Sequence, residues 1–206
     1  YLHRAFNRAD HPPYILNDIR IVDPEQSEQD GSPGVCQIDH LAIHRWGVFI
    51  IESKSIFEKV TVQSDGSGGD EWTRTTQGRK EGFRSPIKQA ERQGELLRRF
   101  LDRHKTDLLG TVRPGLRTIA KVIHKTDQRS FRCMPVQIIV AFSDSSTVER
   151  RRGWTPPKEP FETFVCKADQ VPDKIQEQLE IHRQASGLRS KEQGNYGIWS
   201  MRMEEA

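Results

Sequence analysis

The chain has 206 residues, of which 34% are hydrophobic and 30% charged, and its 32 Lys and Arg against 29 Asp and Glu give a formal net charge of +3. This length supports one large domain with its own core, and the clustering of apolar residues argues against global disorder. The charge is too small to identify a nucleic-acid-binding protein. The longest apolar runs, 47–51 and 138–142, are far too short to span a membrane.

The first half of the chain predicts a helix end followed by strands. Apolar residues and prolines indicate the end of a helix at 1–8, a short strand at 14–22, a polar loop at 23–34, and a hairpin of strands 35–44 and 48–54. The second strand of this hairpin is apolar on both faces, which is typical of a strand in the middle of a covered sheet. Because the chain starts at Tyr1 and not at Met, we expect it to be part of a longer protein.

The second half predicts two helices and further strands. Ser85 and Pro86 form a helix start, and apolar residues recur at helical spacing to about residue 105. Strands are expected at 59–63, 136–142 and 161–165, a second helix at 171–184, and insertions near 64–84 and 105–132. This order predicts a three-layer α/β domain at 1–184, with a central mixed β-sheet flanked by helices, and a C-terminal extension or linker at 185–206.

Several common kinds of site are disfavoured. No glycine-rich dinucleotide-binding or P-loop motif follows a strand. The three cysteines, Cys36, Cys133 and Cys166, are widely spaced and lack a Cys-x-x-Cys pair, so we expect no zinc site. Three buried thiols suit a reducing compartment, and no secretory signal is visible, so a cytoplasmic location without a membrane partner is expected.

Two charged residues end the apolar strand 48–51. Alternation along the strand places Glu52 and Lys54 on one face of the sheet and Ser53 on the other. Charges at the end of a buried strand are costly unless they are paired or bind a ligand. The two residues therefore form either a structural ion pair or part of a reactive site.

Asp39 interrupts the other strand of the hairpin. A two-residue turn at Arg45 and Trp46 would put Asp39 opposite Glu52, whereas a three-residue turn including Gly47 would put His40 there instead. Two adjacent carboxylates repel each other unless a cation lies between them, and ligands that are all oxygen suit Mg²⁺ or Mn²⁺. With the backbone carbonyl of Ser53 as a third ligand and Lys54 to stabilise developing charge, this set suits phosphodiester hydrolysis.

These residues resemble a known family. Asp39 with Glu52-Ser53-Lys54 resembles the D…(D/E)-x-K signature of restriction-endonuclease-like nucleases. The segments QIDHLAI at 37–43, GVFIIESK at 47–54, SPIKQ at 85–89 and PVQIIVAFS at 135–143 resemble the nuclease-related domain called NERD. The resemblance implies a restriction-endonuclease-like core over residues 5–182 and a site role for Gln89. It also implies an acidic residue on a first helix of which only the end is present.

The resemblance further implies a DNA nuclease of DNA processing or phage defence, with a fused or associated helicase, kinase or zinc ribbon. RNA as substrate and a homodimer stay open. An alternative is a catalytically weak or inactive nucleic-acid-binding module on the same fold. The expected phosphate contacts are Lys88, Arg92, Arg99, Arg150, Arg151 and Arg152. Trp72 and Trp154 could stack on bases, but core packing is the preferred interpretation.

Overall fold

The central sheet has five strands. The computed structural model describes residues 2–6, 12–27, 33–112, 114–151, 153–186 and 201. The strand order is β1 (Tyr14–Ser27), β2 (Pro33–His44), β3 (Gly47–Lys54), β7 (Val136–Phe142) and β9 (Phe164–Lys167). β1, β2 and β3 pair antiparallel, whereas β3, β7 and β9 pair parallel, so the sheet is mixed as predicted.

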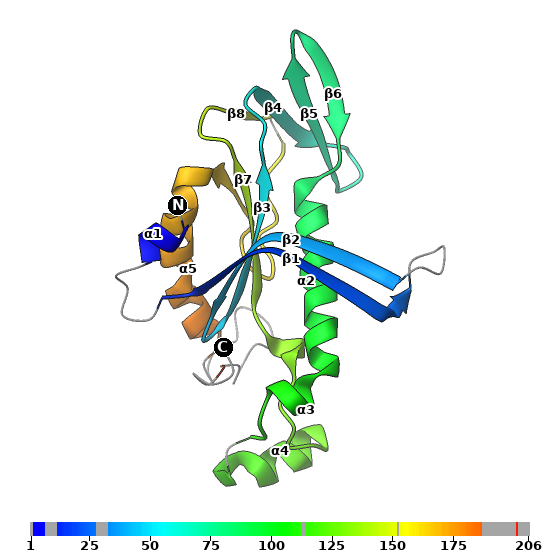
Figure 1. Ribbon diagram of the computed structural model, residues 1–206, viewed down its shortest axis with the longest axis vertical. Coiled ribbons are helices and arrows are strands. Elements are labelled where there is room, and N and C mark those ends of the chain that lie inside the picture. Colours follow the sequence, from blue (N-terminus) through cyan, green and yellow to red (C-terminus); the bar gives the residue numbers. More distant parts are fainter. Residues whose placement is uncertain are drawn as a thin grey trace.

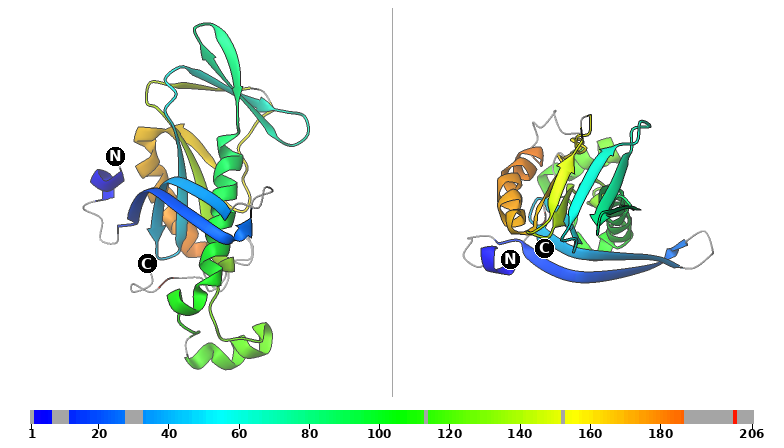
Figure 2. Two further views of the ribbon diagram at one scale, coloured as in Figure 1. Left: turned by 45° about the vertical axis from the view of Figure 1, so that its right-hand side comes forward. Right: turned by 90° about the horizontal axis from the view of Figure 1, so that it is seen from above.

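Helices cover both faces of this sheet. Helix α2 (Pro86–Arg103) lies on one face, and α5 (Val171–Ala185) with the short α1 (Leu2–Phe6) lies on the other (Figures 1 and 2). The side chains of β3 alternate between the two cores. Val48 and Ile50 belong to the cluster beneath α2, and Phe49 and Ile51 to the cluster beneath α5. The prediction of a three-layer α/β fold is therefore confirmed.

Helix α2 begins where the sequence predicts and packs closely on the sheet. The Ser85 side chain accepts a hydrogen bond from the backbone N–H of Lys88, which caps the helix start. A Cβ at Gly94 would lie 2.9 Å from Val136 Cγ1 and 3.2 Å from Ile50 Cδ1. Glycine at this position thus lets the helix approach β3 and β7.

A second sheet of four strands is joined to this core. Its order is β6 (Arg79–Phe83), β5 (Asp70–Thr76), β4 (Lys59–Ser64) and β8 (Thr147–Arg150). Trp72 and Trp154 are buried in its core, with ring centroids 5.7 Å apart, and Trp72 also stacks on Phe142. The core interpretation of both tryptophans is therefore confirmed. The predicted insertion at 64–84 is largely the β5–β6 hairpin.

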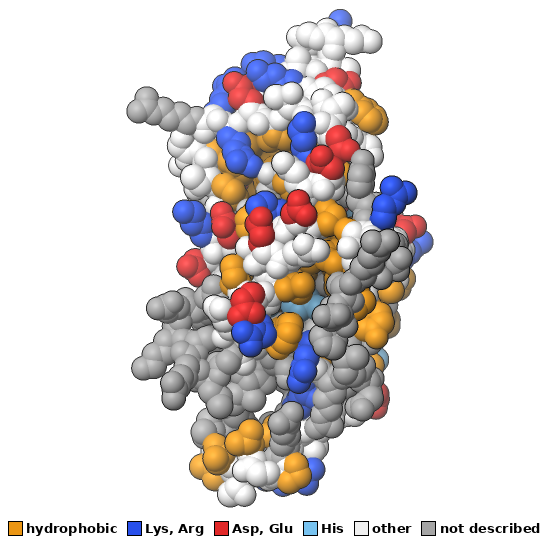
Figure 3. Space-filling view, turned by 90° about the vertical axis from the view of Figure 1, so that its left-hand side faces the viewer, with side chains coloured by type: hydrophobic (Ala, Val, Ile, Leu, Met, Phe, Trp, Pro, Cys, Tyr) orange, Lys and Arg blue, Asp and Glu red, His pale blue; other side chains and the backbone are white. Residues whose placement is uncertain are grey.

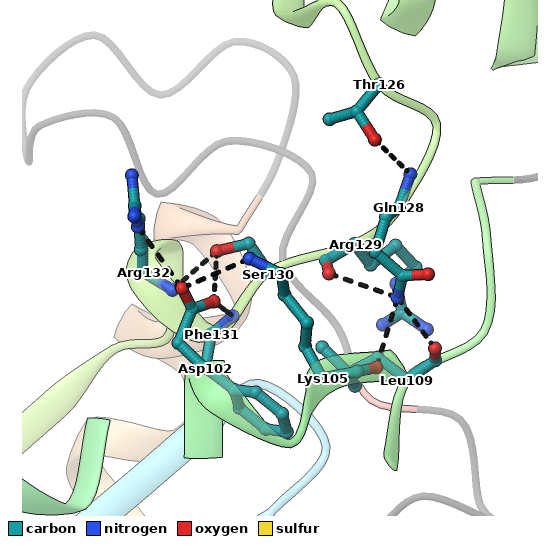
Figure 4. Close-up of polar contacts among 9 residues, drawn as sticks. All are labelled: Asp102, Lys105, Leu109, Thr126, Gln128, Arg129, Ser130, Phe131 and Arg132. Carbon is teal, nitrogen blue, oxygen red and sulfur yellow. Dashed lines mark hydrogen bonds and ion pairs between the residues drawn. The ribbon is translucent and has the colours of Figure 1, made fainter. Parts of the chain in front are cut away.

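The 105–132 segment packs below the core. It contains α3 (Lys105–Leu108), a 3₁₀ turn at Pro114–Leu116 and α4 (Arg117–His124), and it ends in a 3₁₀ turn at Phe131–Cys133. Elsewhere in the chain, a 3₁₀ turn at Ala168–Gln170 leads into α5. Figure 4 shows the attachment of the 105–132 segment to α2. Asp102 accepts hydrogen bonds from Ser130 Oγ, the Phe131 backbone and Arg132 Nε. Gln128 donates to the carbonyl oxygens of Lys105 and Leu109, which closes the loop.

Two sequence predictions need correction. The expected polar loop at 23–34 is wrong at both ends, because β1 continues to Ser27 and β2 begins at Pro33. Asp23 is buried there and forms an ion pair with Arg103 of α2, which compensates for its charge. The strand expected at 161–165 is β9 at Phe164–Lys167, since Phe161 lies before the ladder with β7 and packs in the core.

A buried chain of polar side chains joins the β2–β3 hairpin to α5. His44 Nε2 lies 3.0 Å from His182 Nδ1, and His182 Nε2 lies 2.9 Å from Gln137 Oε1. Gln137 donates to Gln178 Oε1. Burial lowers the pKa of His182 to about 3, and burial and His182 hold the pKa of His44 well below its usual value. Both imidazoles are therefore neutral at pH 7.

Part of the C-terminal region packs against the core. Residues 187–200 and 202–206, in the predicted C-terminal extension, lie outside the described residues. Met201 is buried against the core, and its backbone N–H donates to the Arg45 carbonyl at 2.7 Å. Among the helices described, none combines the length and apolar character needed to cross a bilayer.

Candidate active site

The hairpin of β2 and β3 has the two-residue turn. His44 pairs with Gly47 and His40 with Ile51, so the register places Asp39 at the level of Glu52. The ladder ends at the His40–Ile51 pair, and β2 continues with β1 alone in a long two-stranded ribbon (Figure 1). At this divergence the Ser53 backbone N–H donates to Asp39 Oδ2 at 2.8 Å. Asp39 thus contacts the segment that carries Glu52 and Lys54.

Glu52 is buried and faces helix α2. Its side chain is 1% exposed, and each carboxylate oxygen has a partner. Oε1 lies 2.5 Å from Lys54 Nζ, and Oε2 accepts a hydrogen bond from Gln93 Nε2 at 2.9 Å. The predicted ion pair of Glu52 and Lys54 is therefore present, within a larger set of contacts.

Lys54 joins β3 to the first turn of α2. Its side chain is 22% exposed, and its ammonium donates to Glu52 Oε1 and, at 3.2 Å, to Gln89 Oε1. An ammonium has three N–H donors, so these contacts leave one donor for a ligand. The structure brings together the four predicted residues Asp39, Glu52, Lys54 and Gln89.

Gln93 is the residue that sequence reasoning missed. It lies one helical turn after Gln89, on the same side of α2, and is 6% exposed. Its amide nitrogen donates both to Glu52 Oε2 and to the Gln37 carbonyl on β2, at 2.7 Å. The four-residue spacing from Gln89 is the signal that could have identified it.

A buried thiol lies close to this carboxylate. Burial, and secondarily the negative charge of Glu52, raises the pKa of Cys36 to about 11. Cys36 is 5% exposed and belongs to the core cluster under α2. It is therefore a protonated core residue at neutral pH.

The side chains at this site offer ligand atoms of the chemical type that a divalent cation prefers. Asp39 and Glu52 supply carboxylate oxygens, which Mg²⁺ and Mn²⁺ prefer. Within the described residues Asp39 Oδ1 has no hydrogen-bond donor, and neither has the buried Oε1 of Gln93. The same part of the chain holds no group of three or more His, Cys, Asp or Glu suited to a metal ion. The atoms available to bind a cation at this site are therefore the oxygens of two carboxylates together with backbone or amide oxygens.

The predicted phosphate contacts lie in two places. Lys88, Arg92 and Arg99 are exposed along α2, and Arg99 pairs with Glu95. Arg150 donates to the Val165 carbonyl of β9 in the central sheet, and Arg151 donates to Gln63 Oε1 of β4 in the second sheet, so both guanidinium groups have partners within the protein. Arg152 lies outside the described residues.

One comparison with known proteins identifies the family of the chain. The family model of the nuclease-related domain (NERD) matches residues 2–143, which is more than half of the chain. This range includes β1 to β7 and all five residues that meet at the end of β3. No curated protein and no solved structure matches. The chain belongs to the NERD family, whose name implies a nuclease-related function.

Proposed function

We propose that this domain is a metal-dependent phosphodiesterase that hydrolyses DNA, with Mg²⁺ or Mn²⁺ as its cofactor. The observation that carries the proposal is the meeting of Asp39, Glu52 and Lys54 where β2 and β3 diverge. Membership of a nuclease-related family supports the same reaction class. The reaction adds water to phosphorus and breaks a P–O bond, giving a phosphate monoester and a free hydroxyl group.

Each residue has a defined part in this proposal. Asp39, Glu52 and the Ser53 backbone carbonyl would hold the cation. A bound cation would supply Lewis acidity and lower the pKa of water. Lys54 directs its remaining N–H donor at a phosphate oxygen and stabilises the negative charge that develops there. Gln89 holds the Lys54 ammonium in place through its 3.2 Å contact.

The cations on α2 would bind the DNA backbone. Lys88 and Arg92 are exposed in the first half of α2, and Lys88 is adjacent in sequence to Gln89. Contacts with phosphates give binding that weakens steeply with salt and depends little on sequence. Acidic and basic side chains are mixed on the face that includes α5, where Lys174 pairs with Glu177 and Arg183 with Glu180 (Figure 3).

A cleavage assay tests the proposal. Supercoiled plasmid and linear DNA are incubated with the protein in Mg²⁺, Mn²⁺ or EDTA, using wild type, Lys54→Ala and Asp39→Ala. Cleavage should require the metal and be lost in both variants, while DNA binding is kept. The matched control is Lys121→Ala on α4, which lies at the other end of the molecule from the β5–β6 hairpin (Figure 1). Cleavage that survives both site substitutions would refute the assignment.

A second candidate is a nucleic-acid-binding module with weak or no hydrolysis. Two observations favour it: the Glu52 carboxylate is held by Lys54, and no third acidic residue joins the site among the described residues. Tight, salt-dependent DNA binding without cleavage in any metal would support this candidate. A role in DNA processing or phage defence, beside a helicase, kinase or zinc ribbon, is a further proposal from the family resemblance.

A further inference from the structure

We propose that Gln93 is a positioning residue that sets the spacing of Asp39 and Glu52 and so determines how tightly the site binds a divalent cation. This inference rests on the proposed function. It concerns a residue outside the D…(D/E)-x-K signature.

The two carboxylates lie on strands that no longer pair with each other. The β2–β3 ladder ends at His40 and Ile51, each of which is adjacent in sequence to one of the carboxylates. At the same level of the ribbon, Asp18 of β1 has a φ of 51°, a backbone conformation that L-residues rarely adopt. Since the ladder no longer fixes the distance between Asp39 and Glu52, other contacts must do so.

Gln93 bridges this divergence. Its Nε2 atom donates to the Gln37 carbonyl, two residues from Asp39, and to Glu52 Oε2. The same nitrogen therefore contacts both strands after their ladder has ended. The hydrogen bond from the Ser53 backbone N–H to Asp39 Oδ2 is a second link between the two strands. Without the Gln93 amide, one oxygen of a buried carboxylate would lose its donor, and β2 would lose a link to α2.

The other atom of the same amide is available to a ligand. Gln93 Oε1 is buried and has no hydrogen-bond donor among the described residues. Buried acceptors normally have a partner, and an orphan beside a carboxylate indicates a place for a water molecule or a hydrated cation. The orientation of the amide is fixed, because both partners of its nitrogen are acceptors. Gln93 thus holds the Glu52 carboxylate through its nitrogen, and its oxygen Oε1 is available to a water molecule or a hydrated cation.

The packing of helix α2 holds the buried Gln93 side chain against the end of β3. Gln93 precedes Gly94, where α2 packs so closely on the sheet that a Cβ would lie 3.2 Å from Ile50 Cδ1 of β3. Gln89, one turn earlier, holds Lys54. Two glutamines four residues apart on one helix therefore hold the two charged residues of β3.

Mn²⁺ titration calorimetry tests the inference, with unfolding in EDTA as a second measurement. Gln93→Leu should weaken Mn²⁺ binding about 10- to 100-fold, as loss of a residue that orients a metal ligand does. Gln93→Glu adds a third carboxylate at the same place. It should destabilise the metal-free protein but give a larger Mn²⁺-induced rise in melting temperature than wild type. This second variant keeps the test valid if Gln93→Leu folds poorly.

The matched control is Gln178→Leu. Gln178 is also buried and hydrogen-bonded, to Gln137, but it lies on α5 across the sheet. This variant should lower stability and leave Mn²⁺ affinity unchanged. If Gln93→Leu is destabilised but binds Mn²⁺ like wild type, the positioning role is overturned and the nuclease proposal stands. If wild type neither binds Mn²⁺ nor cleaves DNA, both are overturned.

Discussion

Mild acid should destabilise this domain through its buried histidine pair. Burial lowers the pKa of His182 from 6.5 to about 3, and the side chain is fully buried. Below pH 6.5 the unfolded chain takes up a proton at this residue, whereas the folded chain stays neutral until about pH 3. The stabilisation is therefore complete above pH 6.5 and is lost as the pH falls.

The magnitude follows from the shift. Well inside this window each pH unit lowers the free energy of unfolding by about 1 kcal/mol for one histidine, which gives about 2 kcal/mol from pH 6.5 to 4.5 because the unfolded histidine is only half protonated at pH 6.5. The lowered pKa of His44 adds to this loss in the same direction. The total free energy of unfolding of a globular domain is about 5–15 kcal/mol, so this loss is a large part of it.

Urea unfolding at several pH values from 7 to 4.5 measures this dependence of the free energy of unfolding on pH. His182→Gln keeps a neutral hydrogen-bonding side chain and should flatten the dependence of the free energy of unfolding on pH. Gln178→Leu, in the same polar chain but without a titrating group, should lower stability equally at each pH. A wild-type free energy that is constant from pH 6.5 to 4.5, or an unchanged slope in His182→Gln, would refute the reasoning.

Three further substitutions should change stability by amounts that the packing sets, each measured by urea unfolding. Gly94→Val should cost about 1–3 kcal/mol, because even a Cβ would lie 2.9 Å from Val136 Cγ1. Trp72→Ala should cost about 3–5 kcal/mol, since this side chain is 1% exposed in the core of the second sheet. Lys54→Met should cost about 3–5 kcal/mol if the buried Glu52 charge depends on its ion pair, whatever the metal content.

Matched substitutions separate these effects from general sensitivity. Gly82→Ala meets only Trp72 O at 3.9 Å and should be neutral. Phe57→Ala removes an aromatic side chain that is 67% exposed and should cost little compared with Trp72→Ala. Lys121→Ala should leave stability near that of wild type. Equal losses in a substitution and its control would contradict the packing argument.

Much of the site was predictable because short-range geometry fixes it. Alternation along β3 places Glu52 and Lys54 on one face, and the structure confirms this by their shared contacts with α2. The hairpin register depended on whether the turn has two or three residues, which the sequence left open. The structure has the two-residue turn, with His44 opposite Gly47.

What escaped prediction depends on contacts between distant segments. In the sequence, Gln93 is indistinguishable from an ordinary polar residue of a helix. Its role becomes visible only in the structure, where α2 packs against the end of β3 and Gln93 contacts Glu52. The β5–β6 hairpin was missed because its sequence from Thr73 to Gly82 contains no large apolar residue. Trp72 and Phe83, at its two ends, pack in the core of the second sheet. The far end of β1 was missed because Asp23 is buried by pairing with Arg103, 80 residues later.

The parallel pairing of β3 with β7 has a consequence for synthesis of the chain. All five site residues precede the end of α2 at Arg103, but the strand that pairs along β3 from Val48 to Lys54 begins only at Val136. Until that later segment leaves the ribosome, β3 has an open, apolar edge, the kind of surface on which chains aggregate. The residues proposed to cut DNA are therefore made early, and they reach their final places only when β7 has been translated.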